Sequence, residues 1–252
     1  MKTKMDKRIL LLSKKDSFSK HIELCLKQDK LNVNLSETYI EKENPSVVIV
    51  NLFAFDESIE QQLHLVLKSN VDKVIVLENA LSLYLNSKNP IPFSVYTQLC
   101  PCNEICERCL EIEKKIIESN KKYVIFRISE MYGASVSQNL VEKMLFTNEG
   151  EFENSSHDFI YDGDVISAIE IALRKEVVGL FDIASGQTIE LKKLVDLIKK
   201  LRLIKNLDIV WKRRKTEVSF NCDNFKYYKW EPLVNIELGL KTLYLLRRTR
   251  NG

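Results

Sequence analysis

Glycine is scarce in this chain, and its distribution is more informative than its total. The 252 residues include only 7 glycines, and the first of them is Gly133. Phosphate-binding loops such as the P-loop and the G-x-G-x-x-G turn use glycine, because a side chain would obstruct the close approach of the backbone to the anion. The lack of glycine before residue 133 therefore excludes both kinds of loop from the first half of the sequence.

Long apolar runs and a strong excess of one charge are also missing. No apolar stretch approaches the roughly 20 residues of a membrane span, and the run at residues 9–12 is too short for a secretion signal. Lys plus Arg number 38 against 35 for Asp plus Glu, a balance that does not indicate a nucleic-acid surface. We therefore expect a cytoplasmic protein that binds neither membranes nor nucleic acid.

Short β-branched or leucine-rich runs alternate with longer helical patterns, which is typical of an α/β domain with a parallel sheet. Hydrophobic residues make up 45% of the chain, enough for a sizeable core. The predicted strands cover residues 8–12, 47–51, 74–77, 123–128 and 180–183. The predicted helices cover residues 18–28, 58–69, 103–118, 136–146, 164–173, 191–201 and 236–247.

Three phrases in the second half of the chain have a characteristic order and spacing. They are YVIFRISEMYG at 123–133, HDFIYDGDVI at 157–166 and FDIASGQ at 181–187, and a Trp-Glu-Pro segment follows at 230–232. Together these phrases resemble the extended short-chain dehydrogenase/reductase family, which includes NAD-dependent nucleotide-sugar epimerases and dehydratases. The resemblance covers nearly the whole chain.

The resemblance implies a Rossmann-like, doubly wound parallel sheet. The polar segment at 150–156 is the best candidate for a boundary, since no repeat or flexible linker divides the chain elsewhere. We expect a degenerate Rossmann-like domain in residues 1–150. Residues 151–252 are expected to form a smaller C-terminal α/β part that completes the sheet and corresponds to the family's substrate domain.

The family's phosphate-binding glycines fall at Ser13, Asp16 and Ser19 in this sequence. A dinucleotide pyrophosphate is an anion that lies against bare backbone N–H groups at a helix N-terminus. Asp16 places a like charge there, and Phe53 stands where a small residue normally lines the cofactor cleft. We therefore expect no cofactor, with NAD(P) as the alternative.

The family's chemistry uses a Tyr, a Lys four residues later that lowers its pKa, and a Ser or Thr that holds the substrate oxygen. The resemblance places the Tyr and Lys at Cys102 and Cys106, and the Ser or Thr at Asn79 or Ala80. None of these residues carries the required group. We expect a catalytically inactive relative that acts as a binding, regulatory or scaffolding subunit, and an epimerase, dehydratase or reductase with a rebuilt site remains the alternative.

The family's substrate cleft corresponds to Arg127, Tyr132 and Asp158, which are candidates for binding a small ligand. In the family, the helix at 103–118 also contributes to a dimer contact. An apolar stripe suited to such a contact consists of Ile105, Cys109, Ile112 and Ile116. We expect a homodimer, or a heterodimer with an active family member.

Four of the six cysteines lie within ten residues: Cys100, Cys102, Cys106 and Cys109. On a helix that begins near residue 103, the last three share one face. Two interpretations stay open, namely thiols that pack against the core and a zinc or iron–sulfur site. We favour packing. His21, His64 and His157 have no spacing that indicates a metal site or a catalytic triad.

Overall fold

The computed structural model describes residues 7–39, 41–53, 55–84, 91–137, 139–146, 149–201, 208–212 and 216–250. Within these residues, the central feature is a six-stranded parallel sheet in the order β2-β1-β3-β4-β5-β9. Its strands are β1 (Arg8–Leu12), β2 (Asn32–Ser36), β3 (Val47–Asn51), β4 (Lys73–Asn79), β5 (Lys122–Ile128) and β9 (Gly179–Ile183). The doubly wound α/β class predicted from the sequence is confirmed.

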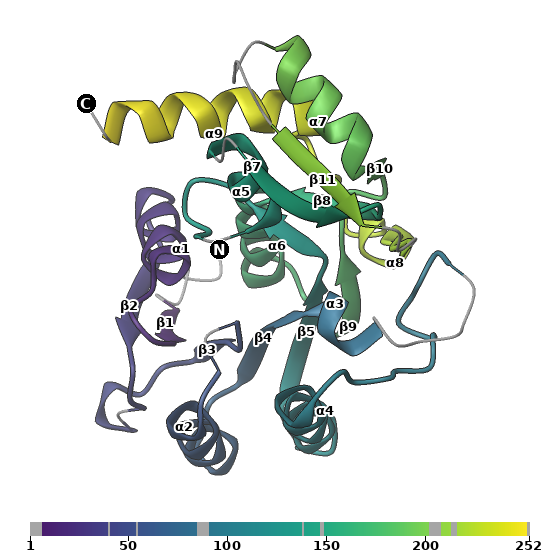
Figure 1. Ribbon diagram of the computed structural model, residues 1–252. Coiled ribbons are helices and arrows are strands. Elements are labelled where there is room, and N and C mark those ends of the chain that lie inside the picture. The colour runs from purple at the N-terminus through teal and green to yellow at the C-terminus, as the bar shows by residue number, and fades with distance from the viewer. Residues whose placement is uncertain are drawn as a thin grey trace.

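The inner strands are apolar because helices cover both faces of the sheet (Figure 1). Every residue of β3 is buried. On one face, α1 (Ser17–Gln28) and α6 (Asp162–Arg174) pack onto a core that includes Ile49 and Phe126. On the other face, α2 (Glu57–Lys68) and α4 (Glu104–Ile117) pack onto Val48 and Val76.

Three of these helices begin at a side chain that caps their first turn. Asp16, Asp56 and Asn103 are the N-caps of α1, α2 and α4, and each accepts a hydrogen bond from the backbone N–H three residues later. Such caps stabilise a helix by satisfying N–H groups that have no partner within it. The N-termini of these helices lie at the carboxyl edge of the sheet, where ligands bind in open α/β folds.

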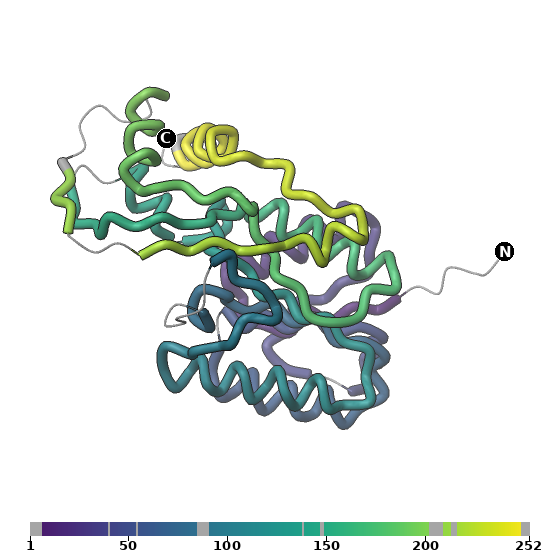
Figure 2. Tube along the Cα trace, turned by 90° about the vertical axis from the view of Figure 1, so that its right-hand side faces the viewer, coloured from purple at the N-terminus to yellow at the C-terminus, as the bar shows by residue number. Residues whose placement is uncertain are grey.

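A second layer lies over this edge and contains most of the C-terminal residues (Figure 2). Its described strands form one three-stranded sheet, β10-β8-β6, and one two-stranded sheet, β11-β7. They are β6 (Glu130–Tyr132), β7 (Glu149–Glu153), β8 (Ser156–Tyr161), β10 (Thr188–Glu190) and β11 (Asp208–Lys212). The helices of this layer are α5 (Leu140–Phe146), α7 (Leu191–Lys200) and α9 (Ile236–Arg250). The short helices η1 (Glu41–Glu43), α3 (Ala80–Tyr84) and α8 (Asp223–Lys226) lie in connections.

The predicted strands and helices are all present, with ends displaced by at most four residues. The predicted break at 150–156 falls on regular structure, and the division of the chain into residues 1–150 and 151–252 stays a prediction. There β7 pairs with β11, and β8 begins at Ser156. In β7, glutamates alternate with Gly150 and Phe152. This strand therefore has the polar composition that is typical of a loop. Residues beyond 151 also supply β9 and α6 to the main layer.

No helix in the described part of the chain combines the length and the apolar content needed to cross a membrane.

Candidate functional site

The turn between β1 and α1 is closed by its own side chains. The Asp16 carboxylate accepts the Ser19 N–H at 2.8 Å and the Ser19 hydroxyl at 3.0 Å. The Ser13 and Ser19 hydroxyl oxygens lie 2.8 Å apart, and both residues are buried. From the end of β3, the Asn51 amide donates to the Ser19 hydroxyl oxygen at 2.9 Å. The positive end of α1 therefore already holds an anion that belongs to the chain itself.

Two neighbours of this turn are committed to other contacts. The Lys14 ammonium lies 2.5 Å from the Asp56 carboxylate at the start of α2, and this hydrogen bond raises the pKa of Lys14. Phe53 packs edge-on against Phe18, with ring centroids 6.2 Å apart. Lys14 is thus paired with the neighbouring helix, and the Phe53 ring belongs to the core beside α1.

Two thiols meet at the N-terminus of α4. The sulfur atoms of Cys102 and Cys106 are 3.3 Å apart, and Cys102 is exposed while Cys106 is buried. Between them, Asn103 caps the helix by accepting the Cys106 N–H at 3.0 Å. Asn79 ends β4, and Ala80 begins α3 and packs in the same apolar cluster as Cys106. The positions that the resemblance assigns to catalysis are therefore neighbours in space.

The four clustered thiols do not share one environment. Cys109 packs with Ile112 and Ile116 beneath α4, away from the cluster that holds Cys106, and burial raises the pKa of its thiol to about 12. The described residues include all four thiols, and no three His, Cys, Asp or Glu side chains among those residues are arranged to hold a metal ion. Cys106 and Cys109 are both buried on α4 but pack in different clusters, and Cys102 precedes the helix, so a metal site at these thiols stays a prediction.

A row of buried charges crosses the sheet close to the carboxyl ends of its strands. Glu78, Arg127 and Asp182 occupy paired positions on β4, β5 and β9. Two hydrogen bonds of 3.2 and 2.5 Å join the Arg127 guanidinium to the Glu113 carboxylate on α4. Arg127 also donates to the Tyr84 hydroxyl at 2.8 Å, and that hydroxyl lies 3.3 Å from an Asp182 oxygen. The five side chains form one enclosed network.

This network contains three carboxyl groups and one guanidinium. Burial raises the pKa of Asp182 to about 7, although the charge of Arg127 lowers it. Burial also raises the pKa of Glu78 well above its ordinary value, and repulsion from Glu113 adds to this effect. Glu113 is the carboxyl group that Arg127 binds through two hydrogen bonds, whereas Glu78 lies 3.5 Å from the guanidinium. The sequence analysis missed Glu78, Glu113 and Asp182, since strand register and the packing of α4 on the sheet bring them together.

The other two candidate cleft residues, Asp158 and Tyr132, are also buried in the protein. Asp158 accepts the Ser185 N–H at 2.9 Å, the Ser185 hydroxyl at 2.6 Å and the Gly186 N–H at 3.1 Å. Burial raises the pKa of Asp158 to about 6. Tyr132 is buried against α9, where a Cβ atom at Gly239 would lie 2.0 Å from its hydroxyl oxygen. A ligand-binding role for Arg127, Tyr132 and Asp158 stays a prediction.

A chain of hydrogen bonds that the sequence analysis missed links the strands of the second layer. His157 lies between Ser155 and Glu130: its Nε2 is 2.7 Å from the Ser155 hydroxyl, and its Nδ1 is 2.6 Å from the Glu130 carboxylate. The His157 ring also stacks on Phe159, with centroids 5.4 Å apart. This order of groups resembles a catalytic triad, but the Ser155 residue is only 5% exposed. The network joins β6 to β8 and to the turn before it.

Solved structures with the same arrangement are enzymes of nucleotide-sugar chemistry. UDP-glucose 4-epimerase from Thermotoga maritima, solved with UDP-glucose, is 19% identical with a TM-score of 0.78 over 97% of this chain and 100% of that chain. The NAD-dependent NDP-hexosamine 5,6-dehydratase TunA is 16% identical with a TM-score of 0.81 over 97% and 98%. The Bordetella bronchiseptica enzyme WbmG, solved with NAD and UDP, is 11% identical with a TM-score of 0.82 over 96% and 95%.

The chain has the fold of the extended short-chain dehydrogenases/reductases. The resemblance found in the sequence is thereby confirmed at the level of the fold. No protein-family model matches the sequence, and no curated protein matches it either.

The expectation that the protein has no cofactor is wrong for this fold. WbmG was solved with NAD, and TunA is described as NAD-dependent. The short-chain dehydrogenase fold therefore makes NAD(P) the cofactor to be tested, and the turn after β1 is where its pyrophosphate would bind. The residues of that turn do not fit a pyrophosphate in the arrangement described, because the Ser19 N–H already donates its hydrogen bond to the Asp16 carboxylate.

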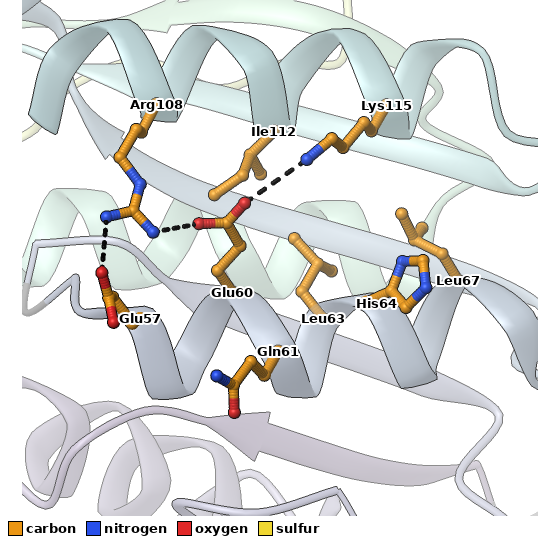
Figure 3. Close-up of a pocket in the computed structure, with 9 residues that line it drawn as sticks. All are labelled: Glu57, Glu60, Gln61, Leu63, His64, Leu67, Arg108, Ile112 and Lys115. Atoms are coloured by element: carbon orange, nitrogen blue, oxygen red, sulfur yellow. Dashed lines mark hydrogen bonds and ion pairs between the residues drawn. The ribbon is translucent and has the colours of Figure 1, made fainter. Parts of the chain in front are cut away.

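The helix face for which the resemblance implies a dimer contact belongs to α4, and Figure 3 shows Ile112 of this face beside residues of α2. Cys109, Ile112 and Ile116 pack inward against the sheet, and only Ile105 of the stripe is exposed. The stripe is therefore part of the core, since α4 turns it toward the sheet. A hollow of about 510 Å³ lies between α2 and α4, where ion pairs join Glu60 to residues of α4. A dimer stays a prediction that this stripe does not support.

Proposed function

We propose that this chain is a non-catalytic protein of the epimerase and dehydratase fold, which acts as a binding or regulatory subunit. The observation that carries the proposal is the contact of two thiols, Cys102 and Cys106, at the N-terminus of α4. The resemblance assigns a phenol and an ammonium to these positions. Two thiols do not replace that pair, because general acid–base catalysis by a phenol depends on a fixed positive charge that lowers its pKa.

A phenol–cation pair exists elsewhere in the chain, but it is enclosed. The Tyr84 hydroxyl lies 2.8 Å from an Arg127 nitrogen, and both side chains are buried. Burial raises the pKa of Tyr84, and Arg127 is held by two hydrogen bonds to Glu113. A phenol in this setting keeps its proton and reaches no substrate. This supports the proposal that acid–base chemistry has been lost.

A nucleotide is the ligand class that we propose for such a subunit. The similar structures were solved with UDP, UDP-glucose or NAD. Binding of NAD at the turn after β1 requires displacement of the Asp16 carboxylate from the N-terminus of α1. The partner of the subunit is proposed to be a second copy or an active enzyme of the same fold.

Calorimetric titration with NAD, NADP and UDP-glucose, combined with chromatography of the sugar nucleotide after incubation, tests this proposal. We expect no turnover by the wild-type protein. The Asp16→Asn variant keeps a capping side chain but loses the charge, so it should bind NAD more tightly. A repulsion of about 1 kcal/mol corresponds to about a fivefold change in affinity.

Asp29→Asn is the matched control, because it also removes a carboxylate from an end of α1, but at the C-cap, away from the turn. It should leave the affinity for NAD unchanged. Steady formation of product by the wild-type protein contradicts the proposed loss of catalysis. Equal affinities of wild type and Asp16→Asn would show that Asp16 does not oppose the dinucleotide.

A further inference from the structure

At the start of α4, the Cys102 and Cys106 thiols touch each other, and Cys102 is exposed. Both thiols lie at the N-terminus of the helix. We propose that Cys102 and Cys106 form a redox-active dithiol, which takes a small-molecule disulfide such as oxidised glutathione as its substrate and closes to an intramolecular disulfide. This inference does not depend on the proposed function, since it needs neither a nucleotide nor a partner.

The geometry brings the two sulfur atoms almost into bonding range. They lie 3.3 Å apart, and a disulfide bond of about 2.0 Å requires them to approach by about 1.3 Å. Cys102 precedes the Asn103 cap and lies outside the helix, so its side chain can move without unwinding α4. The Cys102 N–H donates to the Ser82 carbonyl at 3.2 Å, which fixes the backbone beside α3.

The two thiols have different accessibility. Cys102 is exposed and can meet a disulfide from solution, whereas Cys106 is 4% exposed and packs among Leu83, Phe93 and Phe220. Bulky oxidants therefore reach Cys102 first. Cys106 lies directly behind it, at the distance from which a second thiol attacks a mixed disulfide.

The local electrostatics favour a thiolate at Cys106. Desolvation raises the pKa of this thiol, but hydrogen bonds from the Ser82 hydroxyl, the Cys102 thiol and the backbone lower it, and the net direction is downward. Cys106 also lies in the first turn of α4, where the helix dipole stabilises negative charge. Desolvation and its neighbour Cys106 raise the pKa of Cys102. The pair thus has one thiol accessible to the oxidant and one that is easily ionised.

The other buried thiols lack this combination. Burial raises the pKa of Cys109 to about 12, and it also raises the pKa of Cys222. Cys25 lies on α1, and burial raises its pKa too. The structure therefore singles out Cys102 and Cys106 for exchange, and Cys100 is the nearest thiol in sequence that can serve as a control.

The exchange is balanced in atoms and electrons. The Cys102 thiol gives its proton to the adjacent Cys106 thiolate and attacks one sulfur of oxidised glutathione. A protein–glutathione disulfide forms, and the glutathione thiolate that leaves takes up the proton from Cys106. The Cys106 thiolate then attacks the Cys102 sulfur, the mixed disulfide breaks, and the second glutathione thiolate leaves. The protein pair is oxidised by two electrons and the oxidant is reduced to two thiols, which take up the two protons lost by the protein.

Intact mass and peptide mapping of the full-length protein test the proposal after incubation in glutathione buffers of increasing oxidised fraction. We expect the wild-type protein to lose two hydrogen atoms, with the new bond mapped to Cys102 and Cys106 and reversed by reduced glutathione. A glutathione adduct that persists on wild-type Cys102, or the absence of any change up to fully oxidised buffer, overturns the proposal.

Single variants distinguish the two roles. Cys106→Ser should accumulate a stable glutathione adduct on Cys102, since no second thiol resolves it. Cys102→Ser should acquire neither an adduct nor the disulfide, because the remaining thiol is buried. Cys100→Ser is the matched control and should behave as the wild-type protein does. If Cys100→Ser abolishes the disulfide, or Cys106→Ser still loses two hydrogen atoms, the assignment of the pair is wrong.

Discussion

Two helix N-termini at the carboxyl edge of the same sheet have opposite chemical character. At α1, the Asp16 carboxylate and the hydroxyls of Ser13 and Ser19 satisfy one another and leave a closed turn. At α4, Cys102 is exposed and touches Cys106. At α1, where the glycines of a phosphate-binding turn are missing, the Asp16 carboxylate lies at the helix N-terminus. At α4, the two thiols stand where the resemblance assigns a phenol and an ammonium, and thiols have a different reactivity.

The buried charge network holds α4 through Glu113, so breaking that network should have the largest effect on stability. Arg127→Met leaves the Glu113 carboxylate without its two hydrogen bonds in a buried site. We expect a loss of about 3–5 kcal/mol in the free energy of unfolding, measured by urea denaturation. Arg108→Met is the control, because its ion pairs with Glu57 and Glu60 are partly exposed and contribute up to about 1 kcal/mol. Equal losses in the two variants would show that the buried network has no special role.

A change of pH sharpens the same comparison, because the network has a carboxyl group that titrates near neutrality. The pKa of Asp182 is raised to about 7 in the folded protein, so its stabilising contribution is complete below pH 4 and disappears as the pH rises to about 7. Between pH 5 and pH 8 this group should reduce the free energy of unfolding by roughly 3 kcal/mol.

Asp182→Asn should make the pH dependence of unfolding flatter by that amount, because the amide does not ionise. Urea denaturation at pH 5 and pH 8 provides the measurement. Glu176→Gln is the control, since Glu176 is exposed and pairs with Lys122 at the surface. An unchanged pH dependence in Asp182→Asn contradicts the account of the network.

Substitutions at the N-terminus of α1 should have the smallest effect on stability, because several kinds of side chain can cap a helix. Asp16→Ala removes the N-cap and should lower the free energy of unfolding by about 1 kcal/mol. Asp16→Asn should lose only a fraction of this, since asparagine is also a good cap. Thermal unfolding of the two variants checks the order. Equal losses in the two variants would mean that the charge, and not the hydrogen bond, stabilises the turn.

Local patterns predicted the main layer because its elements are continuous in sequence. The apolar runs of β1 and β3 and the periodicity of α1 and α4 each indicate their own structure. The sequence analysis missed β2, in which polar residues alternate with Val33 and Leu35, as well as the short polar strands of the second layer. The alternation in β2 spans only five residues, and the strands of the second layer are stabilised by partners that are distant in sequence.

The candidate site was predictable only where it depends on local sequence. Asp16 could be recognised because a carboxylate before a helix is a cap. The row of Glu78, Arg127 and Asp182 could not, since it arises from the register of three strands. The partners of His157 lie on β6 and in the turn before β8, so its spacing gave no indication of them.

The most direct test of the central claim is product analysis after a single incubation of UDP-glucose and NAD with an equal amount of the wild-type protein. Stoichiometric protein reveals even one slow turnover, and chromatography separates the starting sugar nucleotide from its epimer or a dehydrated product. The account predicts that UDP-glucose is recovered unchanged. Conversion of the sugar, abolished by Cys102→Ser or Cys106→Ser, would contradict it and would make the α4 end a working active site.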